Sequence, residues 1–167
     1  MTRAEGRRIY FDACVFLAYV GAEAGRVGVV EELLRHATRG LITIITSTVT
    51  IAEVAFGATE KQQRALDAAT EERIDSLWSP GGPVRLIEAS RPIMVAARGL
   101  VRARAAGGGR LSPLDAIHLA TAQAERVDHL ATYEVRVQAT WSQLIGLEVS
   151  EPKVEQPPLE LGQFGGW

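Results

Sequence analysis

Short runs of apolar and β-branched residues alternate along the chain with longer segments whose apolar positions recur every three or four residues. The short runs have the composition of buried strands, and the longer segments have the period of helices that bury one face. The pattern predicts five strands, at residues 9–11, 41–46, 84–87, 129–132 and 147–149. It predicts helices over residues 15–39, 48–58, 60–78, 92–106 and 112–126.

This alternation of strands and helices predicts an α/β domain built on a mostly parallel sheet. The 167 residues are enough for one domain, which we assign to residues 1–150. Residues 151–167 differ, with three prolines, three glycines and little periodicity, and are predicted to form a C-terminal tail. Binding crevices of parallel sheets lie beyond the carboxyl ends of the strands, so residues that follow a strand are the first candidates for a site.

Composition excludes several classes of function. No apolar run reaches the roughly 20 residues that span a bilayer, so no membrane association is expected, and the N-terminus lacks the pattern of a signal peptide. The net charge of −2 excludes an overall basic surface, so any contact with nucleic acid must come from a local patch. The single cysteine, Cys14, excludes an internal disulfide and a cysteine-based zinc site, and favours a cytoplasmic protein.

Four acidic residues stand at the ends of predicted elements: Asp12, Glu53, Asp115 and Glu134. Asp12 and Glu134 follow strands, whereas Glu53 and Asp115 fall in the first turns of helices. If their carboxylates converge at one crevice, the repulsion between them calls for a cation, and Mg²⁺ and Mn²⁺ prefer oxygen ligands. Such ions are a recurring solution for cutting phosphodiesters, so these four residues are candidate catalytic and metal-binding residues.

Three of these acids also have a structural interpretation. Asp12 would cap the helix that follows its strand. Glu53 is the last residue of Thr50-Ile51-Ala52-Glu53, a capping-box pattern, and Asp115 takes the same position after Ser112-Pro113. Both interpretations can hold together, because a helix N-terminus also stabilises a negative charge.

A local basic patch is formed by four arginines within 13 residues: Arg98, Arg102, Arg104 and Arg110. Arg98 and Arg102 are four residues apart and therefore share a helix face. Arg98, Arg102 and Arg110 are candidates for binding the phosphates of a nucleic acid. The alternative is an ordinary solvated helix surface, which most runs of charge form.

Three further polar residues accompany the acids. Ser47 and Thr132 lie at the ends of predicted strands, where their hydroxyls would orient a carboxylate or bind a phosphate oxygen, or act only as caps. His118 lies three residues after Asp115 and shares its helix face. It would contact substrate or a metal-bound group, or be a structural histidine, which the absence of a second His or Cys at ligand spacing favours.

Taken together, the segments around the four acids resemble the PIN domain, and within it the toxin half of VapBC-type toxin–antitoxin pairs. The resemblance covers residues 8–150 and depends on residues 9–14 with Tyr19, 47–57, 111–122 and 130–134. The third segment, which begins Leu111-Ser112-Pro113-Leu114-Asp115-Ala116-Ile117-His118, is the most specific. The family usually has aspartate where this chain has Glu134.

The resemblance implies a Rossmann-like three-layer α/β/α sandwich and a Mg²⁺- or Mn²⁺-dependent endoribonuclease. It implies that Asp12, Glu53 and Asp115 form the metal site. Glu134, one methylene longer than the usual aspartate, would bind through water, take a second ion or be displaced from the site. It also implies an RNA substrate, a cognate antitoxin that wraps and inhibits the enzyme, and a homodimer.

Two other functions compete with this hypothesis. The first is a catalytically inactive PIN-like module that binds RNA or a protein partner. The second is a phosphatase that uses Asp12 as nucleophile, which would need a second acid two residues later, where this chain has Cys14. It would also need a nearby lysine, and the chain has only Lys61 and Lys153.

Overall fold

A computed structural model describes residues 6–155, and residues 1–5 and 156–167 lie outside it. Five strands form one sheet in which every neighbouring pair is parallel. The strands are β1 (Arg7–Phe11), β2 (Ile42–Ser47), β3 (Val84–Ile87), β4 (His129–Ala131) and β5 (Glu148–Ser150). Their order across the sheet is β3-β2-β1-β4-β5, which places β1 at the centre.

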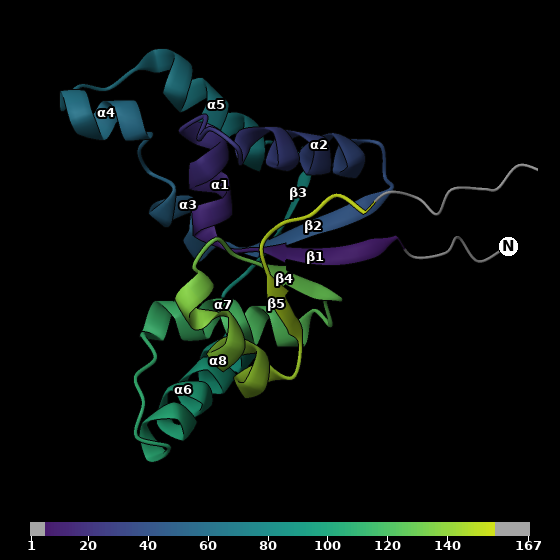
Figure 1. The fold of residues 1–167 in the computed structure, drawn as a ribbon, viewed down its shortest axis with the longest axis vertical. Coiled ribbons are helices and arrows are strands. Elements are labelled where there is room, and N and C mark those ends of the chain that lie inside the picture. Colours follow the sequence, from purple (N-terminus) through teal and green to yellow (C-terminus); the bar gives the residue numbers. More distant parts are fainter. Residues whose placement is uncertain (1–5, 156–167) are drawn as a thin grey trace, which may run out of the picture.

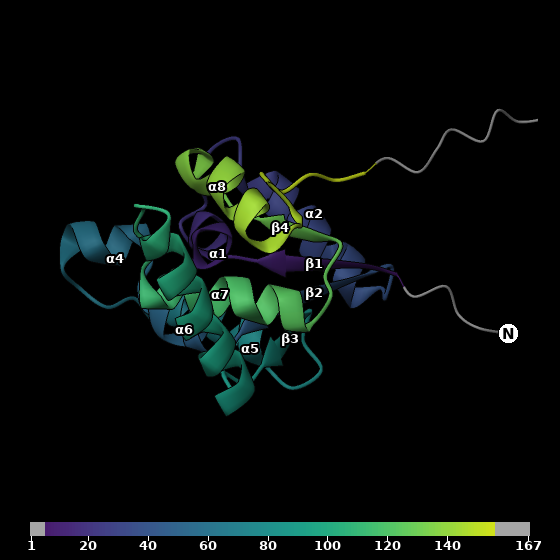
Figure 2. The same ribbon diagram turned by 90° about the horizontal axis from the view of Figure 1, so that it is seen from below.

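Helices cover both faces of this sheet (Figure 1). They are α1 (Ala13–Val20), α2 (Val27–Thr38), α3 (Val49–Glu53), α4 (Ala58–Gln63), α5 (Ala68–Trp78), α6 (Arg91–Ala106), α7 (Pro113–Ala124) and α8 (Val135–Ile145). Helices α1, α2 and α5 lie on one side of the sheet, and α6, α7 and α8 lie on the other (Figures 1 and 2). The predicted three-layer α/β class with a parallel sheet is therefore confirmed.

The central strand explains the two hydrophobic cores. Ile9 and Phe11 of β1 pack with α1, α2 and α5, whereas Tyr10 between them packs with α7 and α8 on the opposite face. Successive side chains of a strand point to opposite faces, so a strand covered on both sides reads as a continuous apolar run. A third cluster joins α6 to α7 on the outside of that layer.

Several predicted helices have different bounds. The helix predicted over 15–39 is two helices, α1 and α2, because Ala22 and Gly25 between them have φ of 49° and 79°. The helix predicted over 60–78 is α4 and α5, separated at Arg64, which has φ of 51°. These left-handed backbone conformations interrupt a helix and are not readable from apolar spacing alone.

One helix, α8, was not predicted. Its segment contains the β-branched residues Val135 and Val137, which favour strands. The signal that identifies it is the spacing of Val137, Trp141, Leu144 and Ile145, all of which pack into the core beside α7.

The predicted tail begins with residues 151–155, which have no regular secondary structure, although Val154 packs against the α1–α2 core. The rest of that tail, residues 156–167, lies outside the described residues. Within residues 6–155 no helix combines the length and apolar character needed to cross a membrane.

Candidate metal-dependent catalytic site

Asp12 is held at the carboxyl end of the central strand. It follows Phe11 of β1 and caps α1, because its Oδ1 accepts a hydrogen bond of 2.8 Å from the Ala13 backbone N–H. Its Oδ2 accepts a bond of 2.9 Å from the hydroxyl of Thr132, which follows β4. Only 7% of Asp12 is exposed. The predicted cap is therefore present, and its carboxylate is fixed by donors from two neighbouring strand ends.

Glu53 reaches the same place from the last residue of α3. Nε2 of the buried His118 donates a hydrogen bond of 2.6 Å to Glu53 Oε2, and the same nitrogen lies 3.9 Å from Asp12 Oδ1. One ring nitrogen thus lies beside two carboxylates that are 41 positions apart in the sequence. The capping-box interpretation of Glu53 is wrong, because α3 begins at Val49 and Glu53 ends it.

Asp115 lies in the first turn of α7, one turn before His118. The Ser112 hydroxyl accepts a hydrogen bond of 3.0 Å from the Asp115 backbone N–H, with Pro113 as the first helical residue. The predicted helix start is therefore present. The Asp115 carboxylate is half-buried, and its charge is one of those that act on His118.

Glu134 is connected to the other acids only indirectly. It is exposed at the start of α8, where its side chain makes no capping hydrogen bond. Its backbone N–H donates a bond of 3.2 Å to the Thr132 hydroxyl, which in turn donates to Asp12. Thr132 therefore orients a carboxylate, as one interpretation of the sequence expected.

The other predicted binding residues lie further out. The Ser47 hydroxyl accepts a long hydrogen bond of 3.5 Å from the Val49 backbone N–H at the start of α3, although the N-cap position belongs to Thr48. Arg98 and Arg102 are exposed on α6 and line a groove of about 280 Å³ that also includes Pro113, the first residue of the helix carrying Asp115. Arg110 is exposed in the loop before α7.

Two contact residues were not identified from the sequence. Tyr10 lies beneath the site, with its hydroxyl 2.7 Å from His118 Nδ1. Cys14 Sγ lies 3.3 Å from Asp12 Oδ2 and accepts a hydrogen bond from the Tyr133 backbone N–H. The position of Tyr10 in an apolar strand predicts only that it is buried, so its polar contact could not be read from the chain.

Electrostatics at the site favour positive charge. Burial alone lowers the pKa of His118, but the hydrogen bond to Glu53 and the charges of Asp12, Glu53 and Asp115 outweigh it and leave that pKa above its ordinary value. Burial, followed by the charge of Asp12, raises the pKa of the Cys14 thiol to about 12. The thiol is therefore protonated at neutral pH when no cation is bound.

These donors fit a hard divalent cation better than a soft one. The groups that converge are carboxylate oxygens, which Mg²⁺ and Mn²⁺ prefer, and the neighbouring sulfur is a protonated thiol. Within residues 6–155 no three or more His, Cys, Asp and Glu side chains are already arranged as a metal site, and Glu53 is paired with His118. The four-carboxylate metal site thus stays a prediction.

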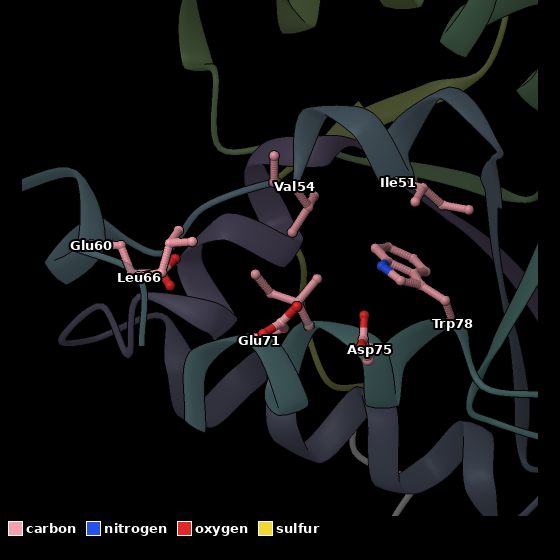
Figure 3. Close-up of a pocket in the computed structure, with 9 residues that line it drawn as sticks. Ile51, Val54, Glu60, Leu66, Glu71, Asp75 and Trp78 are labelled. Atoms are coloured by element: carbon pink, nitrogen blue, oxygen red, sulfur yellow. The ribbon is translucent and has the colours of Figure 1, made fainter. Parts of the chain in front are cut away.

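A separate cavity lies beside this site, between α3, α4 and α5 (Figure 3). It has a volume of about 230 Å³, and Ile51, Val54, Leu66 and Trp78 form part of its apolar wall. Its charged lining consists of Glu60, Glu71 and Asp75, all acidic. Its charged lining therefore offers no positive charge to a nucleic-acid backbone.

Comparison with known proteins gives one family and a set of similar folds. The model of the PIN domain matches residues 9–140. VapBC2 from Rickettsia felis, bound to a DNA fragment from its promoter, aligns with a TM-score of 0.63 and 14% identity over 86% of this chain and 98% of that chain. VapC20 from Mycobacterium tuberculosis, a toxin that cleaves the sarcin–ricin loop, aligns with a TM-score of 0.57 and 17% identity over 79% and 94%.

DNA-bound VapBC from Salmonella typhimurium aligns with a TM-score of 0.61 and 13% identity over 87% of this chain and 98% of that chain. At such identities these structures show a common fold. The comparison with curated protein sequences gives no match.

Proposed function

Because the chain belongs to the PIN-domain family, we propose that it is a metal-dependent endoribonuclease and the toxin of a type II toxin–antitoxin pair. The observation that carries this proposal is the meeting of Asp12 and Glu53 at His118, with Asp115 one helical turn away. Three negative groups at the carboxyl edge of a parallel sheet are suited to hold a cation at a phosphodiester.

In this proposal Asp12, Glu53 and Asp115 hold Mg²⁺ or Mn²⁺. The bound ion would supply a positive charge against the phosphate and increase the acidity of water. Thr132 and the Ala13 backbone N–H keep the Asp12 carboxylate in one orientation. Glu134 is exposed beside them and would approach the site through water, in line with its extra methylene relative to aspartate.

Metal removal tests this function directly. We expect the purified chain to cleave RNA in Mg²⁺ or Mn²⁺, to lose cleavage in EDTA, and to recover it when Mn²⁺ is added in excess of the chelator. The measurement is gel analysis of an end-labelled structured RNA, followed by calorimetry of Mn²⁺ binding. Cleavage that persists in EDTA would contradict the proposal. A folded chain that binds no Mn²⁺ and cuts no RNA would instead favour the inactive PIN-like binding module.

The substrate would be held by cations beyond the acidic site. Arg98 and Arg102 are exposed on α6, and Arg110 is exposed just before the helix that bears Asp115. Their placement supports contacts to phosphates that flank the cleaved bond.

We therefore expect Arg98→Ala combined with Arg102→Ala to raise KM for RNA several-fold with little change in kcat. If each arginine neutralises one phosphate of a single strand, the slope of log KM against log salt should become shallower by about 1.4. The matched control is Arg35→Ala with Arg39→Ala, two exposed arginines at the end of α2 on the other side of the sheet. An equal effect of both pairs would refute a local phosphate site.

The proposed partners follow from the structural neighbours. Two of them are VapBC proteins, and VapC20 is named as a toxin that cleaves the sarcin–ricin loop. We propose that this chain likewise acts on RNA in the cytoplasm, is inhibited by a small cognate antitoxin, and forms a homodimer. Co-expression with the adjacent reading frame, followed by light scattering of the chain alone and of the complex, would test both assemblies.

A further inference from the structure

A continuous chain of hydrogen bonds runs from the backbone of β2 to the Glu53 carboxylate. The Ser47 backbone N–H donates to the Tyr10 hydroxyl at 3.1 Å, and that hydroxyl lies 2.7 Å from His118 Nδ1. The chain ends where His118 Nε2 donates to Glu53 Oε2 at 2.6 Å. The tyrosine and histidine are buried, with exposed fractions of 0% and 1%.

The direction of the last bond does not depend on the charge of His118. A carboxylate only accepts hydrogen bonds, so Nε2 must carry a hydrogen. In a neutral ring Nδ1 then accepts from the Tyr10 hydroxyl. In a charged ring Nδ1 donates to Tyr10 instead, and the Nε2–H still points at Glu53. The buried tyrosine thus keeps the ring in one orientation in both states.

Glu53 needs such support because its own element provides little. Helix α3 has five residues, and its N-cap, Thr48, makes no side-chain capping bond. Two residues flank Glu53 in the sequence. Val54 is buried, whereas Ala52 is exposed. A glutamate at the end of one short turn has three rotatable side-chain bonds, so its carboxylate would otherwise occupy several positions.

We infer that His118 is the positioning residue for Glu53, and that Tyr10 holds it in place. His118 does not bind the cation. It holds one oxygen of Glu53 through Nε2–H, and the other, Oε1, would then be available to a cation. This inference rests on the proposed function, because it assigns Glu53 to the metal site. Groups that hydrogen-bond to metal-binding side chains typically change metal affinity or activity by about 10- to 100-fold when removed.

The test compares Mn²⁺ affinity, measured by calorimetry, in three variants of the full chain. His118→Leu removes the donor and should weaken binding about 10- to 100-fold. His118→Gln keeps an N–H donor near the Nε2 position and should recover part of that loss. Tyr10→Phe keeps the aromatic ring and should weaken binding less than His118→Leu, because Nδ1 loses its partner while Nε2 remains.

The matched control is His129→Leu. His129 is also 1% exposed, and its Nε2 lies 2.8 Å from the Ser150 hydroxyl, but it lies in β4 and contacts none of the four candidate acids. We expect His129→Leu to lower the melting temperature without changing Mn²⁺ affinity. In the cleavage assay the His118 variants should lower kcat and leave KM for RNA nearly unchanged.

Different outcomes contradict different parts of this inference. A wild-type chain that binds no Mn²⁺ overturns the proposed function and the inference with it. Wild-type affinity in a folded His118→Leu variant overturns the inference alone, as does an equal loss in His129→Leu. If His118→Leu does not fold, His118→Phe, which keeps an aromatic ring and removes the donor, takes its place, and wild-type affinity in that variant overturns the positioning role.

Discussion

Replacing Asp12 with asparagine is expected to lower kcat for RNA cleavage by about 10²- to 10³-fold, the range seen when one charge-stabilising group is removed from an active site. The change removes the negative charge and leaves the shape almost unchanged. Asparagine is as good an N-cap as aspartate, so the bond from the Ala13 N–H can persist and α1 should still form. The loss would therefore come from metal binding and not from unfolding.

A sharp control for this variant is Asp67→Asn. Asp67 caps α5, and its Oδ2 accepts from the Thr70 backbone N–H at 2.8 Å, so the same chemical change occurs at another helix cap. Asp67 is exposed and lies outside the acidic site, so cleavage should stay at the wild-type rate. Steady-state kinetics with Mn²⁺, together with circular dichroism and calorimetry, would measure both variants. Full activity of Asp12→Asn would refute the assignment of Asp12 to the metal site.

Much of the fold could be predicted because it depends on local patterns. The apolar runs of β1 to β5 lie within two residues of their predicted positions, since both faces of a parallel sheet are buried. The breaks between helices could not be predicted, because they depend on single residues with positive φ such as Ala22 and Arg64. Neither alanine nor arginine favours that conformation, so the residue types gave no sign of these breaks.

The candidate site was predictable in its residues but not in its contacts. Asp12 and Asp115 follow strong local signals, namely a strand end and a proline-initiated helix. The pairing of His118 with Glu53 joins residues 65 positions apart, and it depends on the packing of α7 against β2, the strand that leads into α3. The sequence favoured a structural histidine, and the structure shows one that is buried and also lies between two candidate metal-binding carboxylates.

Helix α1 joins the candidate site to the hydrophobic core. Asp12 begins this helix, and Phe16, one turn later, anchors it to the core. Phe16 is 0% exposed, and its ring centroid lies 5.5 Å from that of Phe11 in β1 and 5.1 Å from that of Trp78 in α5. A change at Phe16 should therefore act on stability, whereas a change at Asp12 should act on chemistry.

We expect Phe16→Ala to lower the free energy of unfolding by about 3–5 kcal/mol, through lost apolar burial and the cavity left between β1, α1 and α5. Because domains of this size are stable by only about 5–15 kcal/mol, the variant should be close to unfolding at physiological temperature. Urea denaturation followed by circular dichroism and by tryptophan fluorescence measures the change, since Trp78 contacts the substituted ring. The matched control is Leu66→Ala, a large apolar residue that is 82% exposed and should change stability by less than about 0.5 kcal/mol. An equal loss of unfolding free energy in both variants would contradict the core packing. At low temperature, where Phe16→Ala should still be folded, its affinity for Mn²⁺ should equal that of the wild type, because its four acidic residues are unchanged.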